Sequence, residues 1–159
     1  MAVTIKKVST KRDLKRFIRF NYELYKHNPY SVPDLYDDML NTFNRQKNPA
    51  FEFCEADYFL AYKDGKLVGR VAAIINHKAN DTWQKKEVRF GWIDFIDDTE
   101  VSEALIRTVE QWGKERGMTH IKASDTSVSS MKSIQRRRTS FFCRVSLALW
   151  LMMAATRPT

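Results

Sequence analysis

The chain has 159 residues, of which 43% are hydrophobic and 13% aromatic. This length and composition indicate one folded domain, and they exclude both a disordered chain and two full-sized domains. The net charge of +8 is concentrated at one end, because residues 1–121 hold 20 Lys and Arg against 18 Asp and Glu, whereas residues 122–159 hold 7 against 1. The near-neutral first part argues against a nucleic-acid-binding domain face.

The cysteines and histidines give no sign of a metal site. Cys54 and Cys143 lie far apart and match no metal or redox spacing, so we expect free thiols in a reducing compartment. His27, His77 and His120 share no metal-ligand spacing either. The N-terminus lacks the apolar stretch of a secretory signal, so we expect a cytoplasmic protein.

A strand and two helices are predicted first. Residues 3–8 alternate like a short strand. Thr10 is a candidate N-cap for an amphipathic helix whose apolar residues continue at helical spacing to Tyr25. A shorter helix is predicted to start around Pro33, a favourable first-turn residue, and residues 44–50 form a polar connection.

A hairpin and a third strand follow. Residues 58–62 and 67–75 are predicted to be strands joined by Asp64 and Gly65, a turn pair in which both residues adopt positive φ. Residues 88–96 form the next strand, which is apolar on both faces toward its end and therefore central in the sheet. Gly91 within it indicates a bulge or a close approach to the backbone.

The segment after that strand is the best-defined helix of the sequence. Asp97 can cap it with Glu100 at the third position, and Gly117 can end it. Residues 118–122 begin another strand, so strand, helix and strand indicate a parallel crossover. The predicted fold is therefore of the α/β (α+β) class, with element order β-α-α-β-β-β-α-β and a mixed sheet.

This element order resembles the first half of the GNAT acyltransferase fold. Three stretches are also similar to bacterial GNAT-like proteins of unassigned substrate: FIRFNYELYKHNPYSVPDLYDDMLNTF, KNPAFEFCEADYFLAYKDGKLVGRVAAIINHKAND and FGWIDFIDDTEVSEALI. The resemblance covers residues 3–121. It implies transfer of an acyl group from acetyl-CoA or another acyl-CoA to a small-molecule or peptide amine.

The resemblance also implies site residues. In this superfamily the pantetheine lies along the fourth strand and the pyrophosphate rests where the next helix begins, which implies cofactor contacts from the following residues: Phe95, Ile96, Thr99 and Val101. Asp94 lies where some members carry an acidic general base, although it can also be a polar residue at the wet end of a strand. The acid is commonly a tyrosine after the fifth strand, and no Tyr follows Tyr62.

The helix start departs from the family's pattern of Arg or Gln, two residues, Gly, any residue, and Gly or Ala. Residues 96–100 contain no glycine but carry Asp97, Asp98 and Glu100. Their carboxylates would occupy the N–H donors of the helix start and repel a pyrophosphate. We therefore interpret the junction as a self-capped helix start, where a coenzyme could bind only if basic groups from elsewhere compensate.

Residues 122–159 do not continue this pattern. They are rich in Ser and Arg and end in an apolar stretch without a clear period, which we interpret as a poorly ordered non-family tail from a shifted reading frame or read-through. A membrane anchor is one alternative, although the apolar run of residues 145–155 is shorter than the about 20 residues needed to span, so we expect no transmembrane segment. A basic nucleic-acid or partner-binding arm is another.

Residues 1–121 are thus expected to be a truncated GNAT-like domain, inactive as it stands, that self-associates through an exposed sheet edge. Two alternatives stay open. One is a non-catalytic GNAT-like interaction module, and the other is a basic-tailed binder of nucleic acid or of a membrane surface, of which the nucleic-acid partner is the less expected.

Overall fold

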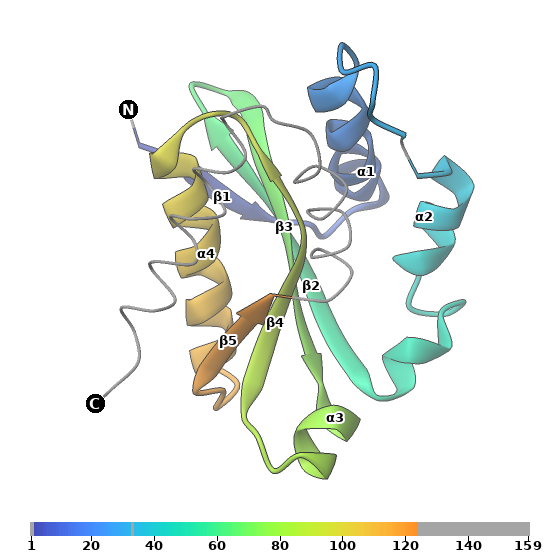
Figure 1. Cartoon of the computed structure of the whole chain (residues 1–159), viewed down its shortest axis with the longest axis vertical. Helices are drawn as coiled ribbons and strands as arrows, with labels where there is room; N and C mark the ends of the chain where they lie inside the picture. Colours follow the sequence, from blue (N-terminus) through green and yellow to red (C-terminus); the bar gives the residue numbers. More distant parts are fainter. Residues whose placement is uncertain (1, 33, 124–159) are drawn as a thin grey trace. The chain divides into compact units, whose positions relative to one another are not determined.

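A computed structural model of the chain describes residues 2–32 and 34–123 (Figure 1). The predicted frame-shifted tail, membrane anchor and basic arm lie outside the described residues, apart from positions 122 and 123. The elements run in the following order: β1 (Thr4–Lys7), α1 (Lys11–Tyr25), α2 (Tyr36–Thr42), the 3-10 helix η1 (Pro49–Glu52), β2 (Cys54–Lys63), β3 (Lys66–Asn76), α3 (His77–Thr82), β4 (Glu87–Phe95), α4 (Thr99–Lys114) and β5 (His120–Ala123).

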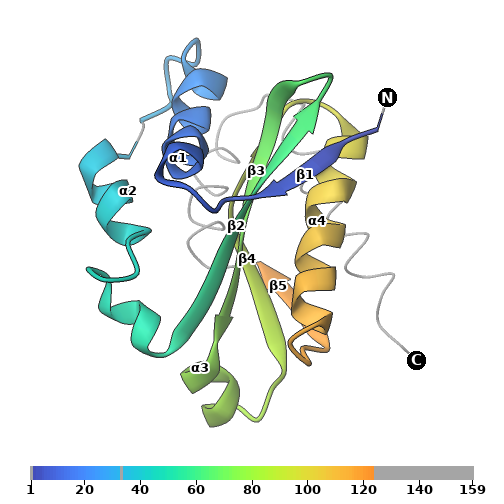
Figure 2. The same ribbon diagram turned by 180° about the vertical axis from the view of Figure 1, so that it is seen from behind.

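The five strands form one mixed sheet in the order β1-β2-β3-β4-β5. Strands β1 to β4 pair antiparallel with their neighbours, whereas β5 is parallel to β4. This parallel pair requires a crossover, which α4 supplies. Helices α1 and α2 cover one face of the sheet and α4 covers the other (Figures 1 and 2). The predicted α+β class and element order are therefore confirmed.

Helix α1 begins and packs as its sequence predicts. The Thr10 side chain accepts a hydrogen bond from the backbone N–H of Asp13 at 3.1 Å, which caps the helix start. Phe17, Ile18 and Phe20 are buried on the side that faces the sheet. Helix α2 begins at Tyr36, later than the predicted start around position 33.

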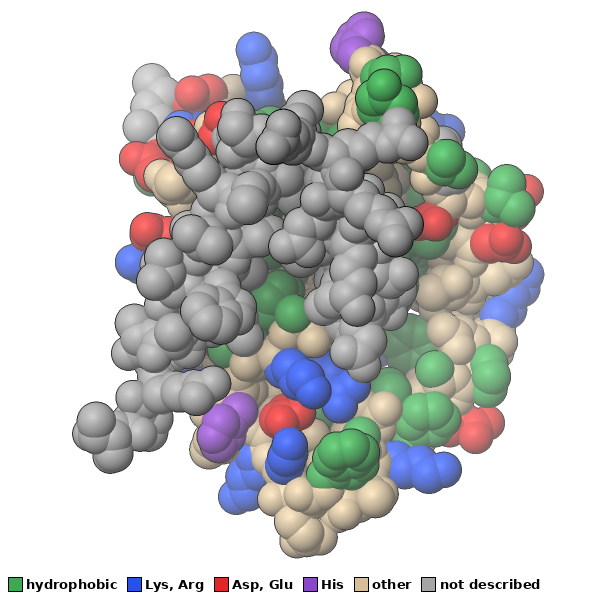
Figure 3. Space-filling model, viewed as in Figure 1, with side chains coloured by type: hydrophobic (Ala, Val, Ile, Leu, Met, Phe, Trp, Pro, Cys, Tyr) green, Lys and Arg blue, Asp and Glu red, His purple; other side chains and the backbone are tan. Residues whose placement is uncertain are grey.

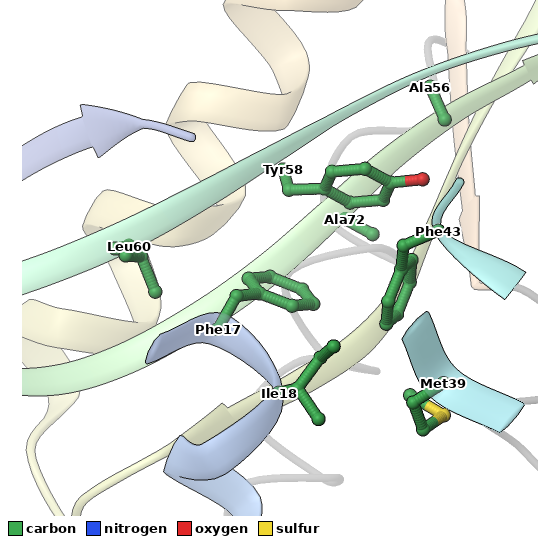
Figure 4. Packing of buried hydrophobic residues seen from close by; sticks show 8 residues of the cluster. All are labelled: Phe17, Ile18, Met39, Phe43, Ala56, Tyr58, Leu60 and Ala72. Atoms are coloured by element: carbon green, nitrogen blue, oxygen red, sulfur yellow. The ribbon is translucent and has the colours of Figure 1, made fainter. Parts of the chain in front are cut away.

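An aromatic cluster joins α1 and α2 to the sheet (Figure 4). The ring of Phe43, after α2, lies 5.4 Å from that of Phe17 on α1 and 4.8 Å from that of Tyr58 on β2, measured between centroids. Trp92 of β4 lies against the same cluster, with its ring 5.0 Å from that of Phe43. Each such pair contributes about 0.5–1.5 kcal/mol beyond the area it buries. The cluster therefore fixes α1 and α2 over the middle of the sheet.

On the opposite face, α4 packs closely because β3 presents a glycine to it. A Cβ on Gly69 would lie 3.0 Å from methyl carbons of both Val101 and Leu105. The buried carboxylate of Asp57 on β2 also binds this helix, since it accepts a hydrogen bond from Trp112 Nε1 at 2.8 Å. Lys7 of β1 donates to the same carboxylate at 2.7 Å.

The turn between β2 and β3 and the short helix α3 complete the path of the polypeptide. The predicted turn is confirmed, with φ of 53° at Asp64 and 74° at Gly65. Helix α3 was not predicted, because its six residues are too few for a periodic pattern; the Asn76 side chain caps it by accepting from Ala79 N–H at 2.9 Å. Among residues 2–32 and 34–123, no helix is both long and apolar enough to cross a membrane.

Candidate functional site

Strand β4 is distorted where it passes the middle of β3. The register shifts between Arg70 and Ala72, so that Trp92 and Ile93 together face a single residue of β3. Trp92 has a φ of 45°, in the left-handed region that residues other than glycine seldom adopt. Bulges of this kind are over-represented next to active sites. The bulge predicted at Gly91 therefore exists, one residue further along the chain.

Among the described residues, the same part of β4 has one edge without a partner strand. Strand β5 pairs with residues 87–90 only. In the part of the chain that the structure describes, residues 91–95 have no partner strand on the β5 side. We call residues 91–95 the β4 edge. Its backbone N–H and C=O groups on that side can bind an extended ligand as an additional strand would.

Asp94 lies on the β4 edge and is held by two partners. Its Oδ2 accepts a hydrogen bond from Nε of Arg70 at 2.7 Å and lies 2.7 Å from Nη2 of the same guanidinium in an ion pair. Its Oδ1 accepts a hydrogen bond from the Tyr25 hydroxyl at 3.0 Å. Arg70 also donates from Nη1 to the backbone carbonyl of Phe17 at 2.7 Å. The network therefore ties the carboxyl-terminal half of α1 to β3 and to the β4 edge.

The burial of Arg70 and Tyr25 determines how these two side chains interact with Asp94. The Arg70 side chain is 1% exposed, so it depends on the Asp94 carboxylate for its counter-charge. Burial, assisted by the adjacent Asp94 charge, raises the pKa of Tyr25 well above its usual value. The phenol therefore stays protonated and donates to Asp94, and it is a poor acid toward a departing thiolate. Sequence analysis missed both partners, although a charged residue inside the apolar run LVGRVAAII was a signal for Arg70.

At the start of α4, acidic side chains cap the helix and pair with a lysine. The N-cap is Asp98 and not the predicted Asp97: Asp98 Oδ1 accepts from the backbone N–H of Glu100 at 3.0 Å. Lys63, at the end of β2, lies 2.6 Å from Asp98 Oδ2 and 2.9 Å from Glu100 Oε2. The hydrogen bond from Lys63 lowers the pKa of Asp98, which stays ionised. The charge of Lys63 is thus already neutralised by these two carboxylates.

The four residues expected to contact a cofactor lie in sequence around this junction. Ile96 donates its N–H to the carbonyl of Val68 at 2.9 Å, so that amide is occupied. The Val101 side chain is fully buried in the core, whereas Thr99 is exposed and Phe95 half-buried. The amides of Ile96 and Glu100 are therefore already bonded, whereas residues 91–95 have no partner strand on the β5 side within the described part of the chain. Among the described residues, no group of His, Cys, Asp and Glu is placed to hold a metal ion.

Comparison with curated proteins gives two relatives. Protein YghO of Escherichia coli strain K12 is 36% identical over 111 residues, which is 70% of this chain and 28% of that protein. A bacterial ceramide synthase of Caulobacter vibrioides strain NA1000 / CB15N is 33% identical over 114 residues, which is 71% of this chain and 30% of that protein. The chain thus spans less than a third of either relative. No protein-family model matches it.

Solved structures match over more of the chain. An aminoglycoside acetyltransferase from an uncultured soil metagenomic sample has a TM-score of 0.55 at 12% identity, covering 99% of this chain and 90% of that one. AAC(6')-Iy, bound to a CoA bisubstrate analogue, has a TM-score of 0.55 at 20% identity, covering 89% and 97%. A tandem GNAT protein from the clavulanic acid pathway has a TM-score of 0.59 at 13% identity, covering 76% and 36%. The chain therefore has a GNAT-like fold, as its sequence indicated.

Proposed function

We propose that this chain serves the transfer of an acyl group from a pantetheine thioester to an amine, and that the amine is a long-chain lipid base. The GNAT-like fold supports acyl transfer, since the similar structures include aminoglycoside acetyltransferases. The lipid acceptor is supported by the relative named a ceramide synthase, because a ceramide is a long-chain base acylated on its nitrogen. The observation that carries the proposal is the β4 edge beside its bulge, which has no partner strand on the β5 side among the described residues.

In the proposed reaction, the amine nitrogen attacks the thioester carbonyl, a C–N bond forms and the C–S bond breaks. The nitrogen loses one proton, and the thiolate that leaves gains one. Backbone groups of the β4 edge would hold the pantetheine arm as an extended strand and align its carbonyl with the amine. The donor is an acyl-CoA or another acylated pantetheine. It is held mainly through the pantetheine arm, because at the start of α4 Asp98 already accepts from the Glu100 N–H and pairs with Lys63.

Asp94 is our candidate for the group that receives the amine proton. Among the described residues, its Oδ1 accepts one hydrogen bond, from the Tyr25 hydroxyl, so this oxygen has a lone pair left for a substrate. Because the buried Arg70 is paired with this carboxylate, we expect slow turnover.

A second candidate function is that of a non-catalytic thioester-binding module. The observation that favours it is the engagement of both Asp94 oxygens by Arg70 and Tyr25.

A paired assay tests the proposal and separates the two candidates. The purified full chain is incubated with palmitoyl-CoA and sphinganine, the N-acyl product is measured by mass spectrometry, and thioester binding is measured by calorimetry with acetyl-pantetheine. Acyl transfer predicts both binding and slow amide formation, which Asp94→Asn abolishes under conditions where circular dichroism shows that the variant is folded. Binding without any product would support the non-catalytic module. Absence of both would overturn the proposal.

A further inference from the structure

The near-neutral charge of the described region hides a strong separation of charge along the chain. Residues 1–19 hold seven Lys and Arg against one Asp, whereas residues 20–123 hold fourteen against seventeen. The single acid, Asp13, is buried beneath Lys6, which pairs with it at 3.0 Å. The surface of the first nineteen residues therefore presents cations almost alone.

Five of those cations form one stripe along α1. We call this set the α1 stripe: Lys11, Arg12, Lys15, Arg16 and Arg19, all exposed. Their spacing places them on the outer side of the helix over about 12 Å, given a rise of about 1.5 Å per residue. The opposite side of α1 is packed in the core, so the helix cannot insert into another medium and can only present its charges. Like charges this close repel one another and favour an anionic partner.

An exposed apolar loop continues the surface of the stripe. Val32 is 92% exposed and Leu35 is 72% exposed, in the connection between α1 and α2. The Tyr22 hydroxyl of α1 donates to the backbone carbonyl of Asp34, and the Arg19 guanidinium lies 5.7 Å from the centre of the Tyr36 ring. These contacts hold the loop against α1 beside Arg19, the last residue of the α1 stripe. Figure 3 shows hydrophobic side chains exposed at this end of the molecule.

We propose that the α1 stripe and the loop side chains of Val32 and Leu35 dock together on an anionic lipid bilayer. A bilayer surface offers both of the chemistries required, since phosphate groups attract Lys and Arg while the layer beneath accepts apolar side chains. A nucleic acid matches the cations but offers nothing to exposed aliphatic side chains. Three acidic residues at the α2 side of the loop weaken the attraction to anionic lipid there: Asp34, Asp37 and Asp38. Most of the electrostatic attraction therefore comes from the α1 stripe. The inference holds whether or not the chain transfers acyl groups.

Vesicle co-sedimentation of the full chain tests this docking. The vesicles are phosphatidylcholine with or without phosphatidylglycerol, at low and at high salt. The stripe variant carries three replacements: Lys11→Gln, Arg12→Gln and Lys15→Gln. The control variant removes the same charge from exposed positions on other elements: Lys66→Gln, Lys86→Gln and Lys114→Gln. Glutamine keeps the helix propensity of lysine, so neither variant should lose its fold, which circular dichroism checks.

We expect binding to the phosphatidylglycerol vesicles that weakens with salt. Each basic residue near the surface is worth about fivefold in partition, so the stripe variant should lose on the order of 100-fold and the control variant far less. Val32→Ser with Leu35→Ser should reduce binding further at high salt, where the charge term is screened. Equal losses in the stripe and control variants would overturn the proposal. So would an unchanged stripe variant, or a DNA duplex that competes as well as the vesicles do.

Discussion

Replacing Asp94 by asparagine should destabilise the fold strongly, because it removes the counter-charge of a guanidinium that is 1% exposed. Arg70 keeps its bond to the Phe17 carbonyl and its place over the Phe17 ring, with Cζ 5.0 Å from the ring centre. It loses the ion pair with the carboxylate, in which Nε and Nη2 both lie 2.7 Å from Asp94 Oδ2. Breaking a buried pair on one side costs about 3–5 kcal/mol. Domains of this size are stable by about 5–15 kcal/mol, so about a fifth or more of the total is at stake.

Urea unfolding followed by tryptophan fluorescence measures the effect. With a slope of about 2 kcal/mol per molar urea, Asp94→Asn should lower the unfolding midpoint by about 2 M. Arg70→Met should also destabilise, whereas the double variant should lose clearly less than the sum of the two, since no unpaired charge is left buried. A loss below about 1 kcal/mol for Asp94→Asn, or additive losses in the double variant, would refute the buried-pair reasoning.

Three further variants or conditions test other parts of the structure. Gly113→Ala should destabilise the fold by about 1–3 kcal/mol, because the new Cβ would lie 2.7 Å from Val88 Cγ1. This loss is expected although alanine favours helices. A gain in stability on thermal unfolding would contradict it. Trp112→Phe should cost about 1.5–3 kcal/mol in urea unfolding, since it removes the hydrogen bond to the buried Asp57, and an unchanged midpoint would count against that bond. Burial raises the pKa of Asp57, but hydrogen bonds from Lys7 and Trp112 outweigh it and the net pKa is lowered. The resulting stabilisation is complete above the unfolded value of about 3.9 and is lost as pH falls through the folded value, so unfolding monitored from pH 5 downward should show less pH dependence in Trp112→Phe than in the parent chain.

Local signals in the sequence predicted most of the secondary structure. The Thr10 cap, the Asp64 and Gly65 turn and the apolar face of α4 each depend on residues a few positions apart, so short patterns were sufficient. The position of the α4 cap was wrong by one residue, because Asp97 and Asp98 are chemically equivalent in sequence. In the structure, Asp98 also contacts Lys63, which lies 35 positions away and could not be read from the local sequence.

The candidate site was harder to predict because its contacts are long-range. The place of Asp94 followed from the family resemblance, but its partners Arg70 and Tyr25 lie 24 and 69 positions away in sequence. The left-handed conformation of Trp92 has no signal at all in a tryptophan, since the bulge is imposed by the pairing of β4 with β3. The α1 stripe was hidden for another reason: a net charge summed over 121 residues averages away a local cluster.

The central claim is that a thioester donor binds through its pantetheine arm at the β4 edge and gains nothing from its diphosphate at the start of α4. Calorimetric titration of the full chain with acetyl-pantetheine and with acetyl-CoA tests this directly. Our account predicts dissociation constants that agree within about threefold. Binding of acetyl-CoA that is tighter by a factor of about ten or more would show that the helix start holds the diphosphate despite Asp98, and would contradict it.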